Sequence, residues 1–202
     1  MTPLLSAIAP VLIILIYVYF RDKYEKEPVK MLVKAVVLGC LIVIPIVFME
    51  RLLVNLLPQV TKVVSAAYHA FVVAAFTEEL IKFLALYLLI WRNPNFNEKF
   101  DGIVYAVFIS LGFAAVENIM YVTEGNHSLA LTRAITAVPA HAIFGITMGY
   151  YFGIAHMYPR KRKRYLRYSL SIPILLHGIY DFILMVEIPW VLMVFAPYVA
   201  FL

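Results

Sequence analysis

The chain has 202 residues, of which 64% are hydrophobic, with a mean hydropathy of +0.88 and a formal net charge of +5. Soluble domains are roughly half apolar, and a core of this size could not hide the excess, so the composition excludes an ordinary soluble protein and predicts a membrane protein. Its basic residues lie in short segments between apolar runs, which is typical of membrane orientation and argues against nucleic acid as a partner. The single cysteine, Cys40, lies in an apolar run, which excludes a disulfide framework or a cysteine metal site within one chain.

The first apolar run covers residues 3–20 and is followed by Arg21-Asp22-Lys23, with no positive charge before it. A cleaved signal peptide carries positive charge before its apolar core and small residues at a cleavage site. This order of charges predicts a retained anchor whose N-terminus lies outside the cell.

Apolar runs of about 20 residues are long enough to cross a bilayer, and the chain has six clear ones and a shorter seventh. The predicted spans are 3–20, 29–49, 63–91, 101–122, 130–157 and 165–186, followed by 188–202, which could span the membrane or lie at its interface. We see no linker, soluble domain or internal repeat. Residues 1–202 are therefore predicted to form a single integral membrane domain, an all-α polytopic bundle.

Most of the 17 lysine and arginine residues lie in or beside the loops that follow the first, third and fifth spans. The alternate loops hold only Arg51, Lys62 and Arg133, and Lys82 lies inside a span. Because cytoplasmic loops carry the excess of basic residues, this bias predicts a multi-pass cell-membrane protein with its N-terminus outside. Anionic lipid accounts for the basic cluster Arg160–Arg164.

Several ionisable residues lie inside the predicted spans, where each costs a few kcal/mol and so needs a reason. They are Glu78, Glu79, Lys82, Glu117, His141, His177 and Asp181. Counted from the cytoplasmic ends of their spans, Glu79, Glu117, His141 and His177 all lie about 18–24 Å into a core about 30 Å thick. Four groups on four spans at one depth predict a common polar cavity in the outer half of the membrane.

Local spacing adds detail to this cavity. Lys82 follows Glu78 by four residues and Glu79 by three, so it can reach either carboxylate. Two adjacent glutamates point about 100° apart on a helix, so one could face a cavity and the other a structural partner. These groups could also be purely structural, as an ion pair that joins two helices.

Two further polar pairs accompany the glutamates. Asp181 follows His177 by four residues and can fix the tautomer of its imidazole, although a buried hydrogen-bonded pair without chemistry would look the same. Glu117-Asn118 forms the second pair, which could alternatively be a polar cap near the headgroups.

A carboxylate beside an imidazole in an apolar pocket suits the activation of water, and a second histidine or Asn118 could donate to an oxyanion. The same side chains could be ligands of zinc. The sequence contains no HExxH, GxSxG or GxGD motif. A proton-coupled or ion transporter would also place glutamate and histidine at this depth, but duplicated halves with interrupted helices are not visible. A third hypothesis is that the protein is a scaffold without catalytic activity.

Five motifs, in order over most of the chain, resemble the PrsW family of bacterial membrane proteases. They are Glu78-Glu79-Leu80-Ile81-Lys82, Phe100-Asp101-Gly102-Ile103-Val104-Tyr105, Gly112-Phe113-Ala114-Ala115-Val116-Glu117-Asn118, His141-Ala142-Ile143-Phe144-Gly145 and His177-Gly178-Ile179-Tyr180-Asp181. The family is distantly similar to CAAX prenyl proteases and Abi proteins, in which the glutamate pair is followed by an arginine. The basic residue here is Lys82, which disfavours a prenyl protease.

The resemblance implies an intramembrane protease that performs site-1 cleavage of a single-span anti-sigma factor and thereby frees an extracytoplasmic-function sigma factor in a stress response. It also implies that Glu78, Glu79 and His177 are essential. Our hypothesis assigns catalysis to Glu78, Glu79, His141 and His177, with Glu78 as general base, and gives supporting roles to Lys82, Glu117, Asn118 and Asp181. A metal such as zinc, if needed, would be held among Glu78, Glu79, Glu117, His141 and His177.

Overall fold

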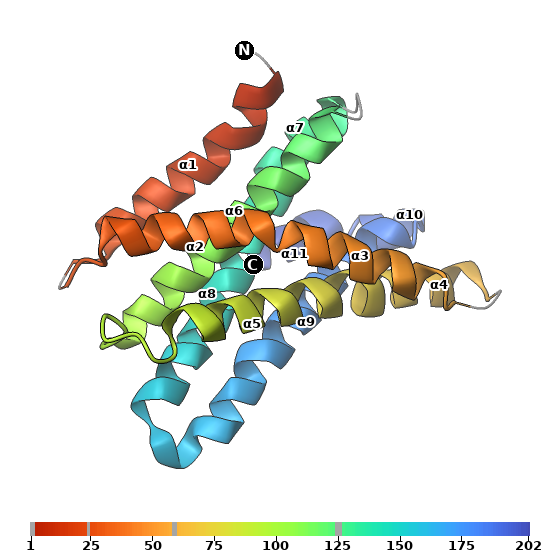
Figure 1. The fold of residues 1–202 in the computed structure, drawn as a ribbon. Helices are drawn as coiled ribbons and strands as arrows, with labels where there is room; N and C mark the ends of the chain where they lie inside the picture. The colour runs from red at the N-terminus through yellow and green to blue at the C-terminus, as the bar shows by residue number, and fades with distance from the viewer. Residues whose placement is uncertain (1–2, 24, 58–59, 124–126) are drawn as a thin grey trace.

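The computed structural model describes residues 3–23, 25–57, 60–123 and 127–202, and every regular element in these ranges is helical, which confirms the all-α fold class. Figure 1 shows how the helices are arranged in space. Their bounds are α1 Pro3–Arg21, α2 Val29–Leu41, α3 Val43–Val54, α4 Lys62–Tyr68, the π-helix η1 His69–Phe76, α5 Thr77–Ile90, α6 Lys99–Thr123, α7 His127–Ile135, α8 Ala137–Met157, the 3-10 turn η2 Pro159–Lys161, α9 Arg162–Met185, α10 Pro189–Leu192 and α11 Phe195–Phe201.

Four helical segments in the described part of the chain are long and apolar enough to cross a membrane: Val29–Val54, Lys99–Thr123, Leu131–Met157 and Pro159–Met185. They correspond to four of the predicted spans. The first and last predicted spans contain shorter apolar helices, Ala7–Arg21 and Pro189–Phe201. The predicted span 63–91 is helical but is divided among α4, η1 and α5. The count of seven spans and the outside N-terminus stay predictions.

Two of the predicted spans are each divided into two helices by a proline. Helix α2 ends at Leu41, four residues before Pro45, and α7 ends at Ile135, four residues before Pro139. Proline has no N–H to donate to the carbonyl four residues earlier, so one hydrogen bond of the helix is missing at each of these positions.

Helix α6 is the centre of the bundle. Every residue from Val104 to Ala114 is buried, and α1, α2, α5 and α8 all pack against this helix. In Figure 1 the α2–α3 pair and the α4–α5 run cross in front of α6 and α8. A helix that is apolar on all sides is expected at the core of a bundle, whereas a helix at its edge needs only one protein-facing side.

Glycines let α6 approach its neighbours closely. A Cβ at Gly149 of α8 would overlap the carbonyl oxygen of Gly102 on α6, and a Cβ at Gly112 of α6 would overlap the backbone of α2 at Val36. Small residues at such contacts allow backbone-to-backbone packing, which drives helix association where lipid removes the hydrophobic gain. The position of α8 relative to α6 therefore depends on Gly149.

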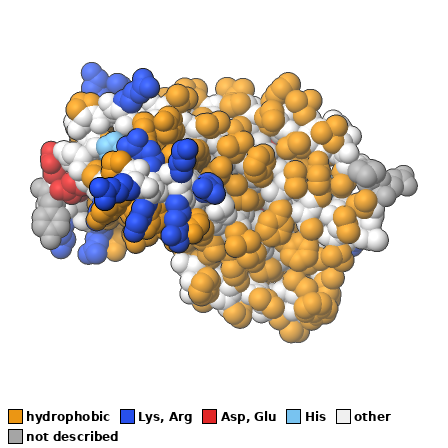
Figure 2. Space-filling view, turned by 90° about the horizontal axis from the view of Figure 1, so that it is seen from below, with side chains coloured by type: hydrophobic (Ala, Val, Ile, Leu, Met, Phe, Trp, Pro, Cys, Tyr) orange, Lys and Arg blue, Asp and Glu red, His pale blue; other side chains and the backbone are white. Residues whose placement is uncertain are grey.

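The outer surface is mostly apolar and its charges are concentrated. Large side chains such as Ile44 and Leu88 are 73% and 83% exposed, as expected where lipid is the solvent. Figure 2 shows lysine and arginine side chains gathered at one end of the visible face, with hydrophobic side chains over the rest. The run Arg160–Arg164, which covers the end of η2 and the first turn of α9, is exposed.

At the junction of α1 and α2 a buried polar cluster ties the connecting loop to α6. The backbone N–H of Glu27 donates to Asp22 Oδ2 at 3.1 Å, and the Tyr105 hydroxyl donates to the Glu27 carboxylate. Burial disfavours the charged form and raises the pKa of Glu27 to about 7, against the lowering effect of the Tyr105 hydroxyl. The loop is thus held by a carboxyl group that is partly protonated at neutral pH.

Gly149→Val tests the close packing of α6 and α8. The added side chain would meet the α6 backbone, which cannot give way, so we expect destabilisation of at least about 1–3 kcal/mol. The measurement is the thermal unfolding midpoint in detergent. Ile146→Val, at a 40% exposed position on the same helix, serves as control and should change stability by less than about 0.5 kcal/mol. An unchanged midpoint for Gly149→Val would contradict this packing.

Candidate active site

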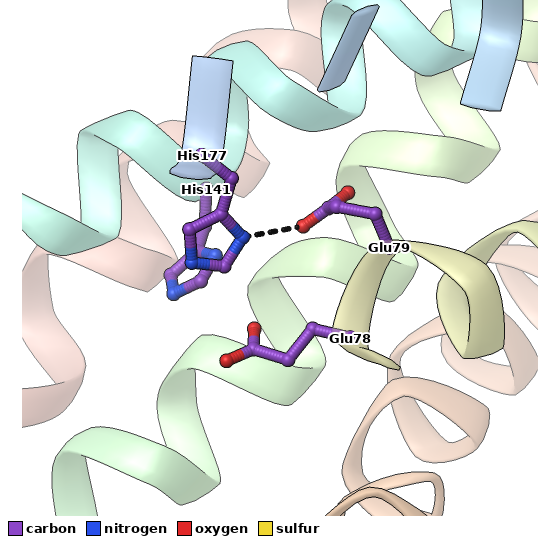
Figure 3. A group of neighbouring side chains, drawn as sticks. All are labelled: Glu78, Glu79, His141 and His177. Atoms are coloured by element: carbon purple, nitrogen blue, oxygen red, sulfur yellow. Dashed lines mark hydrogen bonds and ion pairs between the residues drawn. The ribbon is translucent and has the colours of Figure 1, made fainter. Parts of the chain in front are cut away.

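Four side chains from three helices converge in the interior of the bundle. Glu78 and Glu79 lie in the first turn of α5, His141 on α8 and His177 on α9, and all four are buried. One ligand-type atom from each lies within 4.8 Å of the others. Figure 3 shows the glutamates and the two imidazoles pointing toward one another. The structure thus brings together the four residues to which the sequence assigned catalysis.

The π-helix η1 leads directly into this cluster. It spans His69–Phe76 and ends immediately before α5, and it packs against α9. A Cβ at Gly178 would collide with the ring of Phe71, so the glycine beside His177 makes room for a side chain of η1. A π segment widens the turn and shifts the helix phase, and such segments are frequent at functional sites. The π segment and this glycine together allow α5 and α9 to meet at the site.

Lys82 is the charge that holds the cluster together. Its Nζ donates to Glu78 Oε2 and to Glu79 Oε1, both at 2.9 Å, and lies 3.3 Å from His141 Nδ1. The side chain is only 1% exposed. An ammonium group has three N–H donors and here it has three acceptors, as a buried cation requires. The sequence predicted that Lys82 could reach either glutamate; it reaches both, and His141 as well.

The two glutamates have different surroundings. Glu79 is fully buried, its Oε1 contacts Lys82 and His177, and its Oε2 has no hydrogen-bond partner among the described residues. Glu78 shares Lys82 but also lines a cavity of about 240 Å³. Of these two glutamates, Glu78 is therefore the one placed to contact a molecule in the cavity.

His177 lies between two carboxylates. Its Nδ1 is 3.0 Å from Glu79 Oε1 and its Nε2 is 3.3 Å from Asp181 Oδ2. An imidazolium that donates on both sides satisfies both contacts. The spacing of His177 and Asp181 in the sequence predicted the second contact, whereas the contact with Glu79 joins α9 to α5.

The hydrogen bonds of His141 define its tautomer. The ammonium of Lys82 can only donate, so Nδ1, at 3.3 Å, is the acceptor. Nε2 then carries the proton and donates to Glu117 Oε2 at 3.1 Å. His141 is thus a neutral imidazole whose orientation is set by a lysine on one side and a carboxylate on the other.

The cavity brings in polar residues that the sequence analysis missed. Glu50 and Arg133 both line it, and Arg133 Nη2 is 2.5 Å from Glu117 Oε2. A second cavity of about 180 Å³, between α3 and α6, shares Glu50, Glu78 and Glu117 with the first. Both missed residues lie at the ends of predicted spans, where charge near the headgroups is ordinary, so no sequence signal set them apart. The first cavity is lined by Glu50, His69, Val73, Ala74, Glu78, Glu117, Tyr121, Arg133, Ala137, Ala140, His141, Phe144, His177, Tyr180, Asp181 and Met185.

Asn118 does not line either cavity described above. Its side-chain Nδ2 donates to the carbonyl oxygen of Ala7 in α1 at 3.2 Å. The residue after Glu117 on a helix points about 100° away from it, and here that direction is toward α1. Asn118 was expected to belong to the polar shell of the site, and the structure instead places its side chain against α1.

The four converging residues fit a zinc ion in donor type and spacing. Zinc is commonly held by imidazole nitrogen and carboxylate oxygen, and all four ligand-type atoms lie within 4.8 Å of one another. Glu79 Oε2, buried and without a partner among the described residues, is a donor not engaged elsewhere. Such an ion would compete with Lys82 for the glutamates, because the ammonium contacts one oxygen of each.

A bundle of membrane-spanning helices around a buried Glu/His group next to a polar cavity suits hydrolysis within a membrane, and the family of the chain decides this class. The chain belongs to the PrsW family of intramembrane metalloproteases, whose family model matches residues 27–202. It is therefore a multi-pass membrane peptidase that acts on a protein substrate, and the transporter and scaffold readings are set aside.

Curated relatives agree over nearly the whole chain. Protease PrsW of Geobacillus kaustophilus is 39% identical over 191 residues, 94% of this chain and 83% of the relative. Protease PrsW of Clostridioides difficile is 39% identical over 206 residues, 98% and 85% of the two chains. Protease PrsW of Bacillus subtilis is 37% identical over 199 residues, 98% and 88% of the two chains. No solved structure matches this chain.

Lys82→Met tests the role of the buried ammonium. Its removal leaves two buried carboxylates without their cation, so we expect a loss of about 3–5 kcal/mol in the free energy of unfolding. The measurement is thermal unfolding of the purified protein in detergent. Lys62→Met is the matched control, because Lys62 and Glu187 form an exposed ion pair worth about 1 kcal/mol or less. Equal effects of the two substitutions would refute the assigned role.

Proposed function

We propose that this peptidase makes the site-1 cut in a single-span anti-sigma factor and thereby starts the release of an extracytoplasmic-function sigma factor. Two observations support this substrate. The family resemblance of the five motifs implies it. The distribution of basic residues also predicts that Glu79, His141 and His177 lie in the outer half of the membrane, where a first cut on the extracytoplasmic side would occur. The observation that carries the catalytic part is Glu78, which faces a polar cavity beside two oriented imidazoles.

In this proposal Glu78 is the general base. Its carboxylate takes a proton from the attacking water as the water oxygen adds to the scissile carbonyl, and the same proton then goes to the leaving amine. Glu79 and Lys82 organise Glu78 without facing the cavity. Lys82 holds the Glu78 carboxylate in place through its 2.9 Å contact.

The two histidines have separate roles. His177 lines the cavity, and its Nε2–H, held by the longer contact with Asp181 at 3.3 Å, is positioned to be shared with the oxyanion of the tetrahedral intermediate. Both ring nitrogens of His141 are engaged, by Lys82 and by Glu117, so the imidazole orients the water toward Glu78 as a fixed wall of the cavity. Asp181 keeps the imidazole of His177 facing the cavity.

Zinc is the metal that we propose for this metalloprotease, with Glu78, Glu79, His141 and His177 as the candidate ligands. When bound, it would supply Lewis acidity toward the water and the scissile carbonyl. With zinc bound, Glu78 would still transfer the proton, and His141 and His177 would still orient the reacting groups.

Co-expression with the host's single-span anti-sigma factor tests the substrate and the residues together. We expect immunoblotting to show a shortened product with the wild type, and a loss of at least about 100-fold in product for Glu78→Gln, Glu79→Gln and His177→Ala, since general acid–base groups contribute about 10²–10⁴-fold. The exposed substitution Lys62→Gln, made at equal membrane levels, should cleave normally. A product that persists in all three site variants would return these residues to a structural role, and no product from the wild type would reject the proposed substrate.

Removal of metal tests the cofactor. We expect 1,10-phenanthroline to abolish cleavage by the purified enzyme and added zinc to restore it, while the non-chelating 1,7-isomer has no effect. Elemental analysis should find about one zinc per chain in the wild type and about 10-fold weaker retention in Glu79→Gln, because a metal site loses affinity with each ligand removed. Full activity in metal-free protein would exclude the ion.

A further inference from the structure

Helix α7 contributes one charged side chain to the interior of the site. Arg133 lies in the last turn of this short helix, and its side chain is turned inward, so that it lines the cavity and is only 17% exposed. An arginine at the end of a predicted span would ordinarily extend to the headgroups. From this placement we propose that Arg133 is a positioning residue for the peptidase reaction, acting on His141 through Glu117.

The three residues form a chain of contacts across three helices. Arg133 Nη2 lies 2.5 Å from Glu117 Oε2, and the same oxygen lies 3.1 Å from His141 Nε2. One carboxylate oxygen on α6 therefore accepts from α7 and α8 together. Charge-assisted hydrogen bonds of this kind are short and directional, so the guanidinium restricts where the Glu117 oxygen can lie.

A further hydrogen bond holds the end of α7, and a ring contact holds Arg133. Its guanidinium carbon lies 4.3 Å from the ring centroid of Tyr121, one turn after Glu117 on α6. At the junction of α7 and α8, the Tyr180 hydroxyl of α9 donates to Thr136 Oγ1 at 3.0 Å. The end of α7 is thus fixed to both α6 and α9, which makes Arg133 a rigid partner rather than a mobile surface charge.

The reason Glu117 needs such a partner lies at His141. Lys82 can only donate to Nδ1, so the tautomer and ring orientation of His141 depend on a fixed acceptor at Nε2. Without Arg133, the Glu117 carboxylate would lose the contact that fixes its rotamer, and His141 would lose that acceptor. The chemical step would slow, while substrate binding elsewhere in the cavity would be unaffected.

The experiment measures kcat and KM for cleavage of the single-span substrate by purified protein in detergent. We expect Arg133→Gln to lower kcat about 10- to 100-fold with KM within about 3-fold of the wild type, which is the usual effect of losing an orienting partner. Arg133→Lys, which keeps the charge but not the forked geometry, should recover part of the loss. Arg51→Gln, at an exposed arginine of α3, is the control and should behave as the wild type.

A double-mutant cycle separates positioning from general stability. If Arg133 acts through Glu117, then Arg133→Gln should cost little further activity in a Glu117→Gln background. Losses that multiply, or a wild-type kcat in Arg133→Gln, would overturn the proposal. An equal loss in Arg133→Gln and Arg133→Lys that follows a lowered unfolding midpoint would overturn it too.

This inference rests on the proposed role of His141. The variant His141→Ala distinguishes a failure of that role from a failure of the role of Arg133. Wild-type cleavage by His141→Ala would reject the role of His141 itself. An inactive His141→Ala together with a fully active Arg133→Gln would reject only the positioning role of Arg133.

Discussion

The arrangement of the site depends on one buried ammonium group. Lys82 lies in a medium that cannot solvate a charge, so each of its three donors must find an acceptor within the protein, and it takes them from Glu78, Glu79 and His141. Those acceptors come from α5 and α8, and Glu79 extends the network to His177 on α9. The contacts that stabilise the Lys82 ammonium therefore also hold Glu78, Glu79, His141 and His177 close together.

Helix α6 makes these contacts possible because it is almost entirely buried and has glycines where its neighbours cross. Close backbone approach at Gly102 and Gly149 sets the position of α8, and therefore of His141, while Glu117 on α6 accepts from the other side of that imidazole. This network makes the interior polar between α5, α6, α8 and α9, apart from the separate polar cluster at the α1–α2 junction. A peptidase within a membrane needs such an arrangement, because water and a peptide carbonyl must meet where the surroundings supply few hydrogen bonds.

Much of the site was accessible from the sequence because charge inside an apolar span is costly. That cost singled out Glu78, Glu79, Lys82, His141 and His177, and the i, i+4 spacing predicted the contact between His177 and Asp181. The same reasoning missed Arg133 and Glu50, since charge at the end of a span is unremarkable there. It also placed Asn118 in the polar shell, although its amide holds the backbone of α1.

By itself, the sequence determined that this is an all-helical membrane protein with carboxylates and imidazoles at one depth, because hydropathy and the cost of buried charge act residue by residue. Only the tertiary structure decided that Glu78 faces the cavity while Glu79 is enclosed, that prolines divide two spans, and that Arg133 turns inward to Glu117. These outcomes depend on the rotation of each helix about its axis and on the neighbour it meets. Packing between distant segments sets both, and no local pattern encodes them.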